Sequence, residues 1–125
     1  MSILEFNADE YLSLSIARIY SGRGSPVGAG FLVSRRELLT CAHVITKALN
    51  ISESSSRPTA EITLDFPLFS QGEKFTAKVT NWQIPQPDGG GDIAILKLNQ
   101  APPQRLYKAI LVTSRSLLKV VNFEL

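Results

Sequence analysis

Short apolar segments with period-two alternation recur along the chain, and they restrict its fold more than any other feature. Turn-forming residues separate them, most clearly in Gln83–Gly91, which holds two prolines and three consecutive glycines. Alternation of this kind is typical of strands with one buried face. The residues Ala42–Asn50 instead predict one or two helical turns that end at Asn50. The expected strands are residues 12–16, 27–33, 38–41, 62–66, 75–82 and 93–98.

Six short strands and one brief helix predict an all-β fold, an antiparallel six-stranded barrel. Closing the sheet would remove the exposed edges that such strands otherwise present. With 125 residues, of which 44% are hydrophobic, the chain has room for one packed domain. Gly28 and Gly30 stand inside the second strand, where a close backbone approach or tight curvature is expected.

Composition excludes several classes of protein. A formal charge of +2 is too small to favour a nucleic-acid or membrane-surface partner, and no apolar run is long enough to span a membrane. The single cysteine excludes a disulfide framework, and Cys41 with His43 supplies two of the roughly four ligands that a structural zinc site needs. We therefore expect no metal, and nothing in these residues implies an organic cofactor. The first ten residues do not resemble a signal peptide, so we expect a cytoplasmic protein with Cys41 reduced.

The first candidate for chemistry is His43, the single histidine, which follows the third expected strand. An imidazole held there by a rigid scaffold can act as a general base near neutral pH. The alternative is a structural histidine at a strand end. Cys41 lies two residues earlier, and one interpretation is a Cys–His pair in which the cysteine is the nucleophile. The favoured interpretation is a buried cysteine that acts as a small hydrophobe.

The second candidate is Asp92, which stands between Gly89–Gly91 and the apolar run Ile93–Leu98. A partly buried carboxylate at such a position can accept a hydrogen bond from an imidazole, fix its tautomer and stabilise its protonated form. The alternatives are a carboxylate that only caps a turn, and Asp88, which lies nearby. Asp92 is preferred because it directly precedes the strand.

The segments around these two residues resemble the trypsin-like serine peptidase family. GAGFLVSRRELLTCAHVI is similar to the family segment that carries the catalytic histidine, and GGGDIAILKL to the one that carries the catalytic aspartate. Their order and their separation of about 50 residues also match that template. The resemblance implies the N-terminal barrel of two, with His43 as general base and Asp92 as the residue that orients it. Val44, where many secreted members have a disulfide cysteine, suggests the bacterial, disulfide-free type.

The serine nucleophile of that family has no counterpart in these residues. Only about 30 residues follow Asp92, whereas the template places its serine on the order of ninety residues further on. Ser114 and Ser116 are the later serines, and neither lies in a Gly-Asp-Ser-Gly-Gly segment. We therefore expect a trypsin-like barrel over residues 1–105 and an apolar tail, or a truncated start of the inter-barrel linker, over residues 106–125.

Two functions follow from the resemblance. The first is a serine-endopeptidase-like domain that acts on peptides or proteins but is truncated or inactive alone, its missing barrel supplied by a partner chain or a further segment. The alternative is a non-catalytic peptide- or protein-binding module derived from a peptidase. Cleavage specificity is not encoded here, because the second barrel would set it.

Overall fold

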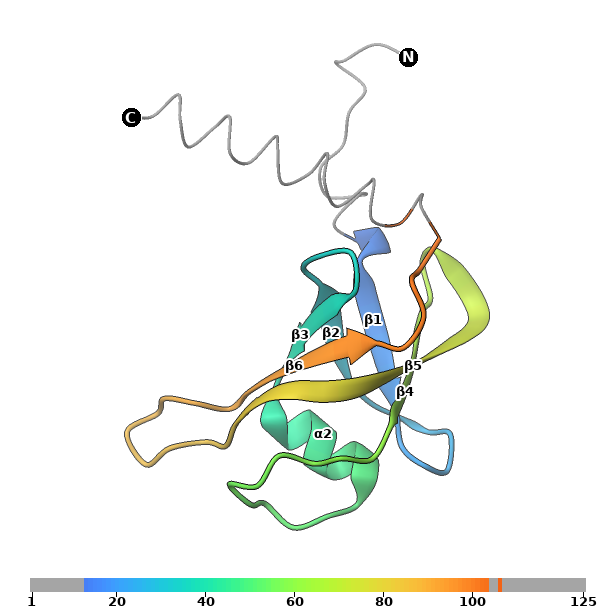
Figure 1. Cartoon of the computed structure of the whole chain (residues 1–125). Helices are drawn as coiled ribbons and strands as arrows, with labels where there is room; N and C mark the ends of the chain where they lie inside the picture. Colours follow the sequence, from blue (N-terminus) through green and yellow to red (C-terminus); the bar gives the residue numbers. More distant parts are fainter. Residues whose placement is uncertain (1–12, 104–105, 107–125) are drawn as a thin grey trace, which may run out of the picture.

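A computed structural model describes residues 13–103 and residue 106, and the elements that lie wholly in this part of the chain are six strands and one helix (Figure 1). The expected segments 38–41, 42–50, 62–66 and 93–98 are confirmed to within a residue at each end, and the second strand begins one residue early. The tail at 107–125 lies outside the described residues. The elements are β1 (Ile16–Tyr20), β2 (Pro26–Leu32), β3 (Glu37–Thr40), α2 (Ala42–Leu49), β4 (Ile62–Phe66), β5 (Ser70–Gln83) and β6 (Ile93–Leu98).

The strands form a closed antiparallel barrel in the order β1-β2-β3-β6-β5-β4, which confirms the expected fold class. Pairing of β1 with both β2 and β4 closes the sheet, so no strand of the barrel is left with an open edge. The last strand, β6, inserts between β3 and β5. This crossing brings residue 92, just before β6, beside the end of β3.

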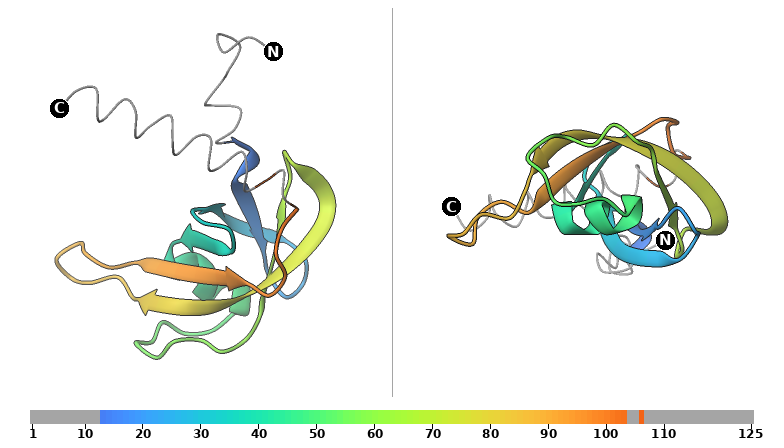
Figure 2. Two further views of the ribbon diagram at one scale, coloured as in Figure 1. Left: turned by 45° about the horizontal axis from the view of Figure 1, so that its top comes forward. Right: turned by 90° about the horizontal axis from the view of Figure 1, so that it is seen from below.

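The helix α2 closes one end of the barrel. Val44, Ile45 and Ala48 lie on its inner face and join the hydrophobic core. In the view from below, α2 lies across the barrel mouth (Figure 2). Asn50 ends the helix in the left-handed conformation, at a φ of 54°, as the sequence predicted. The polar segment after it, residues 51–57, is exposed, and no described helix is long and apolar enough to cross a membrane.

Inward-facing residues of each strand fill the barrel with aliphatic and aromatic side chains. β6 shows the alternation clearly, because Ala94, Leu96 and Leu98 are buried while Ile93 is 43% exposed. Leu106 also packs in this core. The boundary predicted between residues 105 and 106 stays a prediction.

The expected position of the first strand was wrong. Leu12, Leu14 and Ile16 alternate with two serines, which predicted a strand over residues 12–16, and Leu12 lies outside the described residues. The strand instead begins at Ile16, which is 43% exposed, and its core-facing residues are Ala17 and Ile19, both fully buried. Ala17 and Ile19 are together smaller than the leucines and isoleucine of residues 12–16. The alternation of apolar residues that marks a buried strand face was therefore weaker at the true inner positions.

The fifth strand, expected over residues 75–82, begins earlier, at Ser70, directly after the β4–β5 turn. The turn is closed at residues 66–69 by a hydrogen bond of 3.0 Å from the Phe69 N–H to the Phe66 carbonyl. The chain can pair again directly afterwards, and Ser70 lies opposite Phe66 after a register shift. Gly72, whose φ is 91°, accommodates the extra residues of β5 at this register shift.

A buried ion pair joins three strands. Asp65 on β4 has no exposed surface and accepts hydrogen bonds from Arg18 Nε at 3.2 Å, Arg18 Nη2 at 2.9 Å and the Tyr20 hydroxyl at 2.9 Å. Lys74 Nζ on β5 lies 3.7 Å away. Burial alone would raise the pKa of Asp65, but hydrogen bonds from Arg18 and Tyr20, together with both cations, lower it. The carboxylate therefore stays ionised and fixes the β1–β4–β5 register.

The expected close approach at Gly28 and Gly30 is confirmed. A Cβ at Gly28 would lie 2.7 Å from both methyl groups of Val44 on α2. A Cβ at Gly30 would lie 2.9 Å from the Leu39 carbonyl oxygen and 3.1 Å from Thr40 Cβ. The two glycines thus let β2 lie directly against α2 and β3.

We expect Gly30→Ala to lower the free energy of unfolding by about 1–3 kcal/mol, because its first obstacle is backbone that cannot move aside. Gly22→Ala is the matched control: a Cβ there meets nothing within 4 Å, and its φ is not left-handed. Urea unfolding followed by circular dichroism measures both. Equal midpoints for the two variants would contradict the close-approach argument.

Candidate active site

The N-terminus of α2 and the loop before β6 form the candidate site. Cys41 occupies the N-cap position of the helix but makes no side-chain cap hydrogen bond. The cap comes instead from Asp92, whose Oδ1 accepts a hydrogen bond of 2.9 Å from the His43 N–H. The carboxylate also lies against the positive end of the helix, which stabilises its charge.

The loop between β5 and β6 holds Asp92 in this position through backbone geometry. Its tip, residues 86–90, is closed by a hydrogen bond of 2.8 Å from the Gln86 N–H to the Gly90 carbonyl. Gly91 and Asp92 then both take left-handed φ values, 78° and 58°. A Cβ on Gly91 would collide with the Ile84 carbonyl oxygen, so the position accepts only glycine. Aspartate tolerates the left-handed region better than most residues do.

His43 and Asp92, both predicted as site residues, lie in direct contact. The distance from His43 Nδ1 to Asp92 Oδ2 is 2.7 Å. An ionised carboxylate only accepts hydrogen bonds, so Nδ1 carries the proton and Nε2 of the neutral ring keeps its lone pair. The His43 side chain is 59% exposed. The geometry thus supplies a fixed tautomer whose basic nitrogen can reach a substrate.

The Asp92 carboxylate is stabilised in its ionised form. Its partial burial alone would raise its pKa, but the His43 N–H, the His43 ring and the Ala42 N–H together hold the pKa below its ordinary value of 3.8. At neutral pH Asp92 therefore presents an anion to the ring of His43. This is the arrangement that stabilises the imidazolium formed when the ring accepts a proton.

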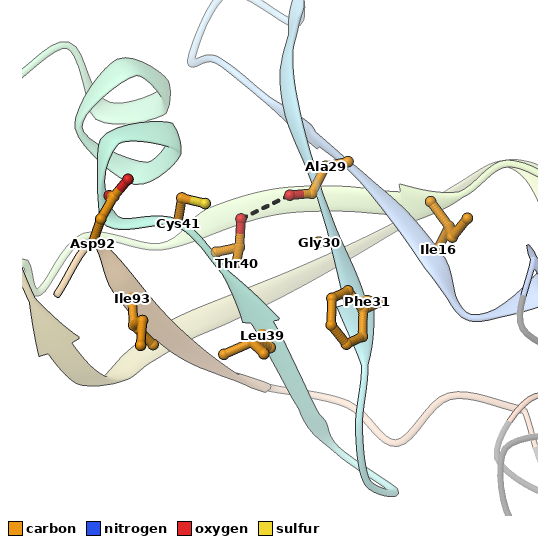
Figure 3. Close-up of a pocket in the computed structure, with 9 residues that line it drawn as sticks. All are labelled: Ile16, Ala29, Gly30, Phe31, Leu39, Thr40, Cys41, Asp92 and Ile93. Carbon is orange, nitrogen blue, oxygen red and sulfur yellow. Dashed lines mark hydrogen bonds between the residues drawn. The ribbon is translucent and has the colours of Figure 1, made fainter. Parts of the chain in front are cut away.

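An apolar pocket of about 420 Å³ adjoins Asp92 (Figure 3). Ile16, Phe31 and Leu39 are direct partners across β1, β2 and β3, and their side chains lie outside the barrel core. Ile93 on β6 extends this row up to Asp92, as the close-up shows. We call these four residues the apolar row. Ile16, Phe31 and Ile93 are 43–46% exposed, so the apolar row is a solvent-exposed hydrophobic surface beside the site.

Thr40 and Cys41 link the row to the site. The Thr40 hydroxyl donates a hydrogen bond of 2.8 Å to the Ala29 carbonyl, which satisfies the polar group of this mostly apolar wall (Figure 3). Cys41 is half-buried at the edge of the pocket and packs against the hydrophobic core, which confirms in part its predicted role as a small buried hydrophobe. The helix begins at Ala42, so Cys41 and His43 do not share an extended strand.

Asp88, the competing acid, does not reach the imidazole. Its Oδ1 accepts a hydrogen bond of 2.8 Å from the Gly90 N–H at the exposed loop tip. It is therefore a turn residue. Sequence reasoning did not find the helix cap by Asp92 or the apolar row. The signal for the row was present, since Phe31 and Ile93 are large apolar residues at positions that alternate with the core.

Comparison with known proteins agrees with this geometry. The model of the trypsin-like peptidase domain matches residues 28–120, which span most of the chain and both segments of the site. The chain belongs to the trypsin-like peptidase family. No curated protein matches it.

Among solved structures, this trypsin-like domain is similar to neuropsin, a serine protease expressed in the limbic system of mouse brain. The match has 19% sequence identity and a TM-score of 0.46, and it covers 75% of this chain. The chain spans 40% of the length of that protease. Membership of the family rests on the family model and not on this likeness.

We expect Asp92→Asn to lower the free energy of unfolding by about 1 kcal/mol at pH 7, because the helix N-terminus loses its facing charge. The pKa of Asp92 is lower in the folded than in the unfolded chain. Its charge therefore stabilises the fold above about pH 4, and this contribution disappears as pH falls through the folded pKa. Urea unfolding between pH 7 and pH 2 should show the two proteins converging.

Asp88→Asn is the matched control, since it removes a carboxylate from the same loop without touching α2. It should change stability by less than Asp92→Asn at pH 7. A difference between wild type and Asp92→Asn that stays constant down to pH 2 would contradict the charge-based cap.

Proposed function

We propose that this trypsin-like domain supplies the general base and its orienting acid to a serine endopeptidase site, with His43 as base and Asp92 as orienting residue. The contact of 2.7 Å between His43 Nδ1 and Asp92 Oδ2 is the observation that carries the proposal. It gives the imidazole the tautomer that proton abstraction at Nε2 requires. The membership of the family supports peptides as the class of substrate.

In the proposed reaction, Nε2 of His43 accepts the proton of a serine hydroxyl as its oxygen attacks the peptide carbonyl. Asp92 stabilises the imidazolium that results. The same proton then passes to the leaving amine as the C–N bond breaks, which leaves an acyl-enzyme. Water, deprotonated by His43, hydrolyses the ester in the second half of the reaction.

We propose that residues 1–125 do not catalyse this reaction alone. The serine and the oxyanion-hole donors would come from a second barrel, in a longer form of the protein or on a partner chain. The apolar row supports this proposal, because it extends from Asp92 across four strands as an exposed surface that a second barrel could cover. A cytoplasmic location, with Cys41 reduced, is part of the same proposal.

Activity measurements test the proposal directly. The purified 125-residue chain should hydrolyse a fluorogenic peptide no faster than its His43→Ala variant. Addition of a chain from the same locus that carries a Gly-Asp-Ser-Gly-Gly segment should give turnover, and Asp92→Asn should lower its kcat by about 10⁴-fold. Turnover by the isolated chain that depends on His43 would overturn the inactivity. Tight association with the added chain but no turnover would favour the non-catalytic binding module.

The apolar row can be tested without a partner. We expect Phe31→Asp to reduce the fluorescence of the hydrophobic dye ANS bound to the chain by at least about twofold, because a charge in the middle of the row disfavours apolar ligands. The fold should persist, since Phe31 is 46% exposed. Leu68→Asp is the matched control: Leu68 is 64% exposed in the β4–β5 turn, outside the row. An equal loss of fluorescence in both variants would argue against a binding surface at the row.

A further inference from the structure

A third side chain stands beside the His–Asp pair and has no role in the proposed peptidase reaction. The Cys41 thiol, a ring nitrogen of His43 and a carboxylate oxygen of Asp92 all lie within 4.8 Å of one another. They come from the N-cap of α2, its first turn and the loop before β6. Three different ligand types therefore meet at one point on the barrel rim. We propose that this cluster is a binding site for a divalent zinc-type cation.

The chemistry of the three groups selects the class of ion. Thiolate, imidazole and carboxylate are the three protein ligands of Zn²⁺, whereas Mg²⁺ and Ca²⁺ take oxygen ligands. Tetrahedral Zn²⁺ with bonds of 2.0–2.3 Å holds its ligand atoms roughly 3.3–3.8 Å apart. The cluster needs to contract by about 1 Å at its widest, while the His43–Asp92 pair opens by a similar amount.

The position of the cluster allows an ion to enter. The His43 side chain is 59% exposed and that of Asp92 is 30% exposed, so a hydrated cation can approach from solvent. Within the described residues, the ion pair of Asp92 is with His43, and no lysine or arginine pairs with its carboxylate. With three protein ligands, the fourth position is left for water, as in open zinc sites.

The helix N-terminus limits how tightly this site binds. The partial positive charge at the start of α2 disfavours a cation, and the charges of the thiolate and of Asp92 offset it. We therefore expect an exchangeable ion, bound more weakly than a structural zinc. If His43 is the general base of the proposed function, the ion competes with its proton-transfer role, and binding makes the site metal-sensitive.

Cobalt titration tests the site in the isolated, untagged chain, kept reduced with a phosphine. Co²⁺ replaces Zn²⁺ in such sites and reports thiolate ligation by a charge-transfer band in the near ultraviolet. We expect one equivalent of Co²⁺ to produce this band and Zn²⁺ to displace it. Cys41→Ser should abolish the band and weaken binding at least about tenfold, and His43→Ala should also weaken binding at least about tenfold. Asp88→Asn should bind as wild type does.

Two outcomes would overturn the metal site: no saturable binding of Co²⁺, or binding without the band and unaffected by Cys41→Ser. Circular dichroism shows whether each variant is folded, and a folded His43→Ala variant keeps the test decisive if Cys41→Ser fails to fold. This result is independent of peptidase activity. Cys41→Ser retains His43 and Asp92, so a failed metal site leaves the proposed function intact, and an inactive reconstituted enzyme leaves the metal result standing.

Discussion

The whole site depends on one carboxylate that bonds to two parts of the same residue. Asp92 accepts the backbone N–H of His43 with one oxygen and contacts its ring with the other, at 2.9 and 2.7 Å. The first contact fixes where α2 begins and the second fixes how the imidazole is turned. Because Cys41 offers no cap of its own, helix start and ring orientation are set together. A displacement of β6 relative to β3 would therefore disturb the fold and the chemistry at once.

The barrel meets this constraint through strand order. The pairing of Thr40 with Ala94 places the end of β3 beside the start of β6, and the left-handed residues Gly91 and Asp92 turn the chain toward α2 at that point. The buried Asp65 pair stands elsewhere on the barrel and fixes β1, β4 and β5. Asp65 thus stabilises the register of the sheet, and Asp92 stabilises the start of α2 at the barrel rim.

The sequence predicted the barrel, the helix and the two site residues because each leaves a local pattern. Apolar alternation marks β4 and β6, Asn50 marks the end of α2, and the segments around His43 and Asp92 resemble a known family. The first strand was misplaced because Ala17 contributes little apolar signal although it is fully buried. The helix cap was missed because it joins residues far apart in sequence. The apolar row depends on which face each strand turns outward, and this is decided by pairing across β1, β2 and β3.

The place of β6 between β3 and β5 also determines when, during synthesis, the barrel can close. Until residues 93–98 have been synthesised, β3 and β5 each keep an unpaired edge. The nascent chain then has an open sheet that is prone to aggregate through these edges. The same late segment brings the carboxylate to the imidazole. Formation of the His43–Asp92 contact and loss of the exposed strand edges therefore both depend on the synthesis of this one strand.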